Sequence, residues 1–256
     1  MRKAIIGGTG VYQLEEARET QTILTAFGSV SYDIMSIEGQ EIVFLARHGS
    51  KHALPPHKIN YRANMMALKM LEVDEILATC AVGSMNDAFA PGDIVVIRDF
   101  IDFTKNRPQS FYEGDDTKVV HVEMTDPYCS NLRSRFLQRA GMLEIMVQGE
   151  AVYVCTEGPR FETASEIRMY RQLGGDVVGM TNVPEVVLAK ELGMCYAAVG
   201  IITNWCTGIE GNSIEGHQID QSMALRKNQV TKAFVDVLTN DPLEKSCACS
   251  RSLIVL

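Results

Sequence analysis

The sequence contains no long uninterrupted hydrophobic run. Its most apolar region, residues 183–202, is broken by Glu185, Lys190 and Glu191. A membrane-spanning helix needs ~20 consecutive apolar residues, so we expect no segment that crosses a membrane. An apolar signal sequence with a cleavage site is also missing after Met1, where a strand-like segment begins almost at once. These features predict a cytoplasmic protein.

Basic residues are outnumbered by acidic ones. The chain has 24 Lys and Arg against 32 Asp and Glu, which gives a formal net charge of -8. Nucleic acids and membrane surfaces are polyanionic and are bound by basic surfaces. We therefore expect neither partner, and the composition favours a protein that acts on a small molecule.

The seven cysteines do not include two pairs at the spacing of a zinc site. Most lie in apolar segments, where a thiol usually packs as a small hydrophobic side chain, and disulfides are rare in the cytoplasm. Cys247 and Cys249 form an isolated C-x-C, a spacing compatible with a redox or metal pair. Without a second pair we expect no metal ion, and whether these two cysteines form a disulfide stays open.

Short β-branched runs alternate with longer amphipathic segments along the chain. With 256 residues, 46% of them apolar, the chain is long enough for one large core, and we expect one domain. Strands are predicted in residues 3–8, 41–46, 75–82, 93–102, 151–158, 176–181 and 195–204, and helices in residues 59–72, 126–142, 163–175, 184–193 and 221–241. Because several strands are apolar throughout, the pattern indicates an α/β protein with a central, largely buried sheet.

The first predicted strand ends in a glycine-rich loop, "GGTG", which contains Gly8, Thr9 and Gly10. Glycines let backbone amides converge on an anion, and the Thr9 hydroxyl adds a donor. A dinucleotide fingerprint needs a third glycine where Gln13 stands, and no Walker Gly-Lys-Ser/Thr follows. The loop is therefore either a site for a bare phosphate or an ordinary tight turn.

Charged residues follow the second predicted strand in "ARHG". Arg47 has the planar fork suited to bidentate phosphate contacts, and His48 can donate a further hydrogen bond. The alternative is a plain surface loop. His52 and His57 come shortly after and are less informative.

Two further strand ends carry groups suited to a planar ligand. Phe161 can stack on a ring and Glu162 can accept from an N–H edge, although Glu162 also fits the acidic first turn of a helix. The strand 195–204 ends in Asn204, whose amide both donates and accepts, although an asparagine there also fits a strand cap.

Several ordered blocks together resemble one known family, the purine nucleoside and methylthioadenosine phosphorylases. The resemblance runs from about Ala4 to Leu238 and leaves a C-terminal tail of about residues 239–256. Its blocks are "GGTG", "ARHG", "INYRAN", "PGDIVVIRDFIDFT", "RPQSFYEG", "TEGPRFET", "GMTNVPEVVLAKELG" and "IITN". The resemblance implies a single nucleoside phosphorylase domain over residues 1–256, built on a mixed β-sheet flanked by helices.

The resemblance implies phosphorolysis, in which a purine nucleoside and orthophosphate give a free purine and a pentose 1-phosphate. Orthophosphate is then a co-substrate, and no cofactor, metal or covalent intermediate is expected. By similarity, the phosphate is bound by Thr9, Arg47, His48, Ala81 with Cys80 beside it, and Thr181. Cys80 stands where methylthioadenosine phosphorylases often have threonine.

By the same resemblance, Phe161 stacks on the base and Met180 packs under the sugar. Methylthioadenosine phosphorylases have a small hydroxyl residue in place of Glu162, and aspartates in the segment matching Asn204 and Cys206. A 6-oxopurine offers O6 and N7 to an amide and N1–H to a carboxylate, whereas adenine has no proton on N1. We therefore expect a catalytic pair, Asn204 and Glu162 assisted by His48, that acts on inosine and guanosine.

The sequence says less about the residues that contact the 5' position of the sugar. His217 falls near a histidine that nucleoside phosphorylases place on the 5'-hydroxyl, and His121 matches one contributed by a neighbouring subunit. The resemblance thus implies a trimer, or a hexamer built from trimers. A methylthioinosine or methylthioadenosine phosphorylase is the near alternative, and an oxidoreductase or a non-catalytic binding protein are the distant ones.

Overall fold

A nine-stranded mixed sheet carries the fold of the computed structural model, which describes residues 2–8, 18–37, 39–49, 54–114, 119–209, 216–240 and 247–256. Its strands are β1 (Arg2–Gly7), β2 (Arg18–Thr25), β3 (Gly28–Ile37), β4 (Gln40–Ala46), β5 (Val73–Ser84), β6 (Ile94–Phe103), β8 (Gly149–Thr156), β9 (Val177–Gly179) and β10 (Cys195–Trp205). A second sheet pairs β7 (Val120–Val122) with β11 (Leu253–Val255). The helices are α1 (Tyr61–Met70), α2 (Ser130–Met142), α3 (Ala164–Gln172), α4 (Asn182–Glu191) and α5 (Gly216–Asn240), with 3-10 turns η1 (Pro56–Lys58) and η2 (Cys249–Arg251).

The large sheet closes on itself at one end. Its strand order is β10-β6-β8-β9-β5-β1-β4-β3-β2, and β10 also pairs with β5. The β5–β10, β1–β5, β1–β4, β6–β8 and β8–β9 pairs are parallel, whereas β6–β10, β5–β9, β2–β3 and β3–β4 are antiparallel. β10 therefore pairs with β5 from Cys195 to Trp205 and also with β6 at Val199–Ile201, and it is buried almost throughout.

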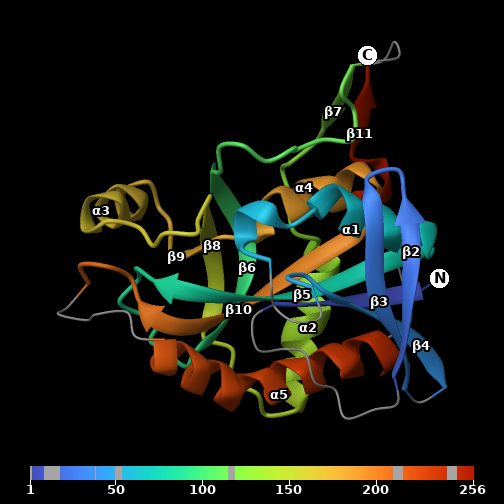
Figure 1. The fold of residues 1–256 in the computed structure, drawn as a ribbon. Coiled ribbons are helices and arrows are strands. Elements are labelled where there is room, and N and C mark those ends of the chain that lie inside the picture. Colours follow the sequence, from blue (N-terminus) through green and yellow to red (C-terminus); the bar gives the residue numbers. More distant parts are fainter. Residues whose placement is uncertain are drawn as a thin grey trace.

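Helices cover both faces of this sheet, as Figure 1 shows. α1 and α4 pack on one face around Met65 and Val186, whereas α2 and α5 pack on the other around Phe136 and Phe234. Phe136 and Phe234 meet edge to face with ring centroids 5.6 Å apart. The predicted α/β class, with a buried mixed sheet flanked by helices, is confirmed.

All the predicted strands and helices are present, but the sequence analysis missed β2, β3, β7 and β11. The β2–β3 hairpin lies at the sheet edge, and its outward positions are polar, so it lacks the continuous apolar run used to find the other strands. Alternation of buried Val30 and Tyr32 with polar neighbours was the signal available in the sequence.

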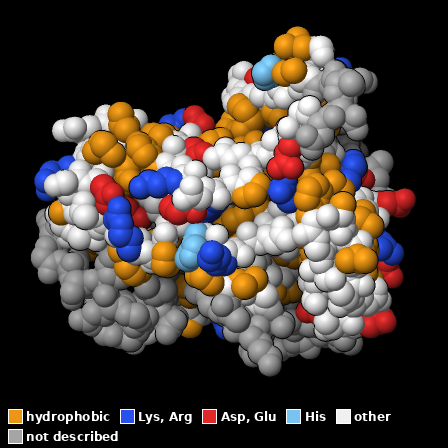
Figure 2. Space-filling view, turned by 45° about the horizontal axis from the view of Figure 1, so that its top comes forward, with side chains coloured by type: hydrophobic (Ala, Val, Ile, Leu, Met, Phe, Trp, Pro, Cys, Tyr) orange, Lys and Arg blue, Asp and Glu red, His pale blue; other side chains and the backbone are white. Residues whose placement is uncertain are grey.

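The β7–β11 sheet forms an arm that projects from the body and carries the C-terminus (Figure 1). Exposed apolar side chains lie on it, namely Val119, Ile254, Val255 and Leu256. The space-filling view in Figure 2 shows apolar side chains on this projection, and acidic and basic side chains interspersed over the rest of that face.

Residues 104–114, which follow β6 and have no regular secondary structure, are bound to the body. Arg107 is buried and donates to the carbonyls of Thr156, Glu157 and Val183. The Ser110 hydroxyl donates to the Glu191 carboxylate at the end of α4. Among the described helices, each falls short of the length or the apolar character that crossing a membrane needs.

Candidate active site

A cavity opens where β1, β4, β5, β8, β9 and β10 approach their carboxyl ends. Its volume of about 220 Å³ is several times the ~30 Å³ of a liquid water molecule, which leaves room for an organic ligand. Its lining includes Gly8, Arg47, His48, Cys80, Ala81, Gly83, Phe161, Glu162, Met180, Thr181, Thr203, Asn204 and Cys206. Crevices at the carboxyl ends of strands are the usual ligand sites of open α/β sheets.

Asn204 reaches this cavity because β10 carries an irregularity beside it. Ile202 pairs with Val82 of β5, yet Asn204 pairs with Gly83, so Thr203 is an extra residue in the ladder. Such bulges re-aim side chains and are frequent near active sites. The Asn204 oxygen accepts from the Thr203 hydroxyl at 2.8 Å, and its nitrogen donates to the Trp205 carbonyl at 2.9 Å. The amide is thus fixed, and its nitrogen has a second N–H.

Arg47 lies in the cavity wall, but its fork is directed at a carboxylate. Nε and Nη2 each donate to Glu185 at 2.7 Å, and Nη1 donates to the Thr79 carbonyl, also at 2.7 Å. Burial works to lower the pKa of Arg47, but Glu185 more than offsets it, and the pKa is raised well above its ordinary value. The bidentate phosphate clamp expected from the sequence is therefore not the arrangement present. These partners take up three of the five N–H donors of the guanidinium.

Glu185 is a site residue that sequence reasoning did not find. Its carboxylate also accepts from the Tyr196 hydroxyl at 2.6 Å and, with Arg47, it is fully buried. A carboxylate within the apolar run around Val183 and Val186 was the available signal, since buried charges are nearly always paired.

The glycine loop and His48 adjoin Arg47. Gly7 pairs with Ala46, which brings Gly8 beside Arg47. The Gly8 N–H, however, donates to the Thr79 hydroxyl at 2.9 Å and does not point at an anion. Nδ1 of His48 lies 2.8 Å from the Leu54 carbonyl, and since a carbonyl only accepts, Nδ1 carries the proton.

The next part of the wall is formed by β5 and the start of α4. Cys80 is buried, and burial raises the pKa of its thiol to about 12, so it stays protonated. Thr181 precedes the first residue of α4, and its N–H donates to the Tyr153 hydroxyl at 3.0 Å. Val183 has non-helical backbone angles, so the regular turns of α4 begin after it and not at Thr181.

Glu162 and Phe161 lie at another side of the cavity with Met180. Glu162 is buried and accepts from the Thr156 hydroxyl at 2.6 Å, whereas Phe161 is 51% exposed. Cys206 is buried close by, and burial together with the charge of Glu162 raises the pKa of its thiol. Glu162 precedes the N-cap of α3, so its alternative role in the first turn of that helix is excluded; Thr163 and Glu166 form the capping box instead.

None of the other four histidines considered in the sequence, nor Thr9, is described as part of the cavity wall. Thr9 and His52 lie outside the described residues, as does the His217 side chain, although α5 includes its backbone. His57 lines a separate pocket beside Arg107. His121 is on the projecting arm, opposite Ile254, and does not line the cavity of this chain.

The fold and the cavity together define a class of enzyme. A closed mixed sheet with a cavity that joins an arginine and a threonine to an amide and a carboxylate fits an enzyme that handles an anion and a planar ring. The sequence pattern of the Phosphorylase superfamily matches residues 2–238. The chain belongs to this superfamily of phosphorylase enzymes, as the sequence predicted.

Known proteins resemble the chain over nearly its whole length. A probable 6-oxopurine nucleoside phosphorylase from Moorella thermoacetica is 47% identical, covering 98% of this chain and 97% of the relative. A probable S-methyl-5'-thioinosine phosphorylase from Methanopyrus kandleri is 46% identical, with coverage of 97% and 96%. The crystal structure of a methylthioadenosine phosphorylase from an antarctic soil metagenomic library superposes with a TM-score of 0.89 at 32% identity, covering 99% and 91%.

Proposed function

We propose that this protein is a phosphorylase of 6-oxopurine nucleosides, which converts inosine or guanosine and orthophosphate to the free purine and ribose 1-phosphate. The observation that carries the proposal is that Glu162 and Asn204 line the same cavity as Arg47 and Thr181. One end of the cavity thus suits a 6-oxopurine, and the other end suits an anion. The names of relatives agree with this activity.

Bond cleavage proceeds through positive charge on the sugar and negative charge on the departing purine, as in other glycosidic cleavages. A phosphate oxygen forms the new bond to C1' while the bond from C1' to N9 breaks, and the electron pair leaves with the purine. The phosphate dianion serves as nucleophile and as counter-charge, so the proposal involves no metal, cofactor or covalent enzyme intermediate. Met180 in the cavity wall provides an apolar surface for the sugar.

The protein's main catalytic contribution is a donor at the base. The second N–H of Asn204 stabilises the charge that develops on N7 and O6, and a donor of this kind contributes ~3 to 4 kcal/mol in other enzymes. Thr203 and Trp205 hold the amide in place before the base arrives. Glu162 accepts from N1–H and is itself oriented by Thr156.

At the phosphate end, Arg47 contributes positive charge although Glu185 balances much of it. We place phosphate against Arg47, Thr181 and the Ala81 backbone, with Cys80 and His48 at its sides and Thr9 from the glycine loop. His48 takes part as the neutral ring with an accepting Nε2, or donates through Nε2 when the ring is charged.

The 5'-methylthio nucleosides remain a second candidate, since S-methyl-5'-thioinosine carries the same 6-oxopurine. The relative from Methanopyrus kandleri, whose name refers to that substrate, is as similar as the one named for 6-oxopurine nucleosides. We favour a 5'-hydroxyl because His217 matches the histidine of nucleoside phosphorylases.

Phosphate-dependent release of base decides between these substrates. Inosine, guanosine, adenosine, methylthioinosine and methylthioadenosine are assayed in parallel with and without phosphate. We expect inosine and guanosine to be the best substrates and no turnover without phosphate. A higher kcat/KM for methylthioinosine than for inosine assigns the second candidate, and efficient cleavage of adenosine contradicts the proposed base contacts.

We also propose that the enzyme is a trimer, or a hexamer built from two trimers, in which His121 completes a neighbour's site. The exposed apolar residues of the arm, among them Ile254 and Val255, support an interface there. Light scattering tests this assembly, and a fully active monomer contradicts it. A role in purine salvage and a cytoplasmic location accord with this reaction.

A further inference from the structure

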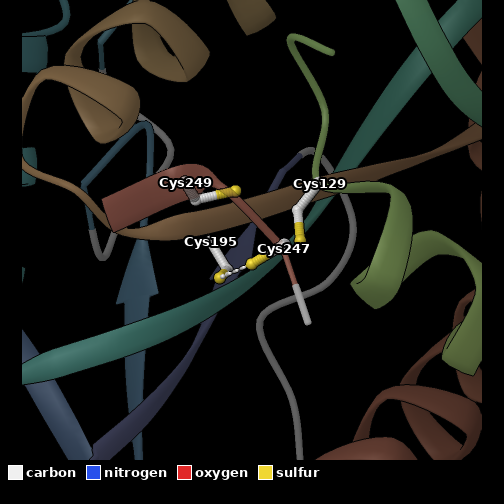
Figure 3. A group of neighbouring side chains, drawn as sticks. All are labelled: Cys129, Cys195, Cys247 and Cys249. Atoms are coloured by element: carbon white, nitrogen blue, oxygen red, sulfur yellow. Dashed lines mark hydrogen bonds between the residues drawn. The ribbon is translucent and has the colours of Figure 1, made fainter. Parts of the chain in front are cut away.

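Four cysteine side chains from three distant parts of the chain meet away from the nucleoside cavity. Cys129 immediately precedes α2, Cys195 is the first residue of β10, and Cys247 and Cys249 follow α5. Their sulfur atoms all lie within 4.8 Å of one another, and Figure 3 shows the four side chains converging. The sulfurs of Cys195 and Cys247 are 3.4 Å apart.

This spacing suits a tetrahedral metal. Zinc binds thiolate sulfur at ~2.3 Å, which places the sulfurs of a tetrahedral site ~3.8 Å apart, within the range seen here. Four sulfur ligands with no oxygen or nitrogen ligand select a soft or borderline ion such as zinc over magnesium or calcium. All four cysteines are free thiols, each able to supply a thiolate.

We propose that Cys129, Cys195, Cys247 and Cys249 bind one zinc ion as a structural site. Four protein ligands fill a tetrahedral coordination sphere and leave no position for water or substrate, which distinguishes structural from catalytic zinc. This site is independent of the proposed function. Cys195 and Asn204 lie near opposite ends of β10, ~30 Å apart at ~3.3 Å per residue.

The surroundings favour a closed site. Cys129, Cys195 and Cys249 are at most 5% exposed, and only Cys247 is partly accessible.

The ion would anchor the C-terminal segment to the body. Cys249 begins η2, and Ser252, which follows it, donates to the Lys190 carbonyl of α4 at 2.9 Å. β11 comes directly afterwards and pairs with β7, the strand that carries His121. Removing the ion therefore loosens the arm first, while the sheet keeps its own core.

The isolated C-x-C gave no sign of this site because the other two ligands, Cys129 and Cys195, are 66 residues apart in the sequence. They also lie on different elements of the fold. The expectation of no metal was derived from spacing alone. Only the folded arrangement supplies the second pair.

The test uses the full chain, purified with a non-thiol reductant and without a metal-affinity tag, and its metal content is measured by mass spectrometry. We expect about one zinc per chain, released when a mercurial titrates the thiols. Cobalt substitution is expected to give the strong visible bands of a tetrahedral sulfur site. Metal-free protein is also titrated with zinc against a chelator dye.

Cys249→Ser is expected to lose zinc binding at least tenfold in affinity and to lower the Tm, whereas the matched control Cys155→Ala keeps one zinc per chain. Cys155 is a buried thiol outside the cluster. The proposal is overturned if reduced wild-type protein neither retains nor takes up zinc. It is also overturned if intact mass shows disulfides, each lowering the mass by two hydrogens, that form in preference to a zinc complex.

Discussion

Arg47 and Glu185 form a bidentate ion pair, with two hydrogen bonds of 2.7 Å between side chains that are completely buried. Arg47 thus meets a carboxylate where the sequence led us to expect a phosphate. The pair keeps a positive charge in the cavity wall that would otherwise be too costly to bury. A phosphate that approaches Arg47 joins an ion pair which already exists.

The ion pair between Arg47 and Glu185 predicts that phosphate binding and the thermal stability of the protein are coupled. Glu185→Gln removes the counter-charge of a buried guanidinium, and such losses destabilise proteins by ~3 to 5 kcal/mol. Phosphate then becomes the only anion near Arg47, so saturating phosphate is expected to raise the Tm of Glu185→Gln more than that of the wild type. Differential scanning fluorimetry over a phosphate series measures both shifts.

Glu75→Gln is the matched control. Glu75 is a buried partner of Arg135 in an ion pair of 2.6 Å that does not line the cavity. This variant is expected to lose stability but to keep the wild-type response to phosphate. Equal phosphate responses in all three proteins would show that Arg47 has no contact with phosphate.

Base selectivity depends on Asn204 and Glu162. A site that leaves buried polar groups unpaired rejects the wrong base strongly, so inosine is expected to exceed adenosine by ~10³ or more in kcat/KM. Asn204→Asp replaces the donor with an acceptor and should reduce this preference mainly by slowing inosine. Adenosine activity should recover only in the double variant with Glu162→Ser.

Steady-state assays of the three proteins decide this prediction. The change at Asn204 also removes the donor to Trp205, so circular dichroism and Tm serve as controls for folding. An Asn204→Asp enzyme that keeps the wild-type preference for inosine contradicts the assigned role.

Cys80→Thr is expected to lower the KM for phosphate, because threonine adds a hydroxyl donor at the cavity wall beside the phosphate. Burial raises the pKa of the Cys80 thiol to about 12, so the thiol is uncharged throughout the assay range. The ratio of the two enzymes' phosphate KM values should therefore stay constant from about pH 6 to about pH 9. A ratio that rises or falls with pH would show that Cys80 ionises.

Gly8 is required by close packing at the end of β1. A Cβ added there would lie 2.6 Å from the Thr79 carbonyl oxygen and 2.9 Å from Nη1 of Arg47. We expect Gly8→Ala to displace Arg47, cost ~1 to 3 kcal/mol of stability and raise the KM for phosphate.

Gly141→Ala provides the comparison for that variant. Gly141 lies in α2, and a Cβ there meets no atom within 4 Å. Alanine at such a helical position is expected to stabilise by ~0.5 to 1 kcal/mol and to leave phosphate kinetics unchanged. Chemical denaturation and the KM for phosphate are measured for both variants. A Gly8→Ala protein with the stability and phosphate KM of the wild type would contradict the packing argument.

Much of the site was predictable because its residues follow strand ends. Apolar runs identify buried strands, and parallel strands bring their carboxyl ends to one edge, as β1, β4 and β10 do for Gly8, Arg47 and Asn204. Glu162 follows β8, which runs opposite to these strands, and only the family resemblance grouped it with them. The direction in which the Asn204 side chain points was not predictable. It depends on the extra residue Thr203 in the β10 ladder, and a one-residue change of register reverses the face of every later side chain.

The sequence by itself determined the helices and the apolar strands of the body, the superfamily, and the groups available for an anion and a purine. Local periodicity encodes the helices and strands, since burial on one face or two is set by neighbouring residues. Only the tertiary structure decided that Arg47 meets Glu185, 138 residues away, and that Cys129 and Cys195 join Cys247 and Cys249. Such partners are chosen by how elements pack, because a buried charge or thiol is satisfied by whatever group the packing places against it.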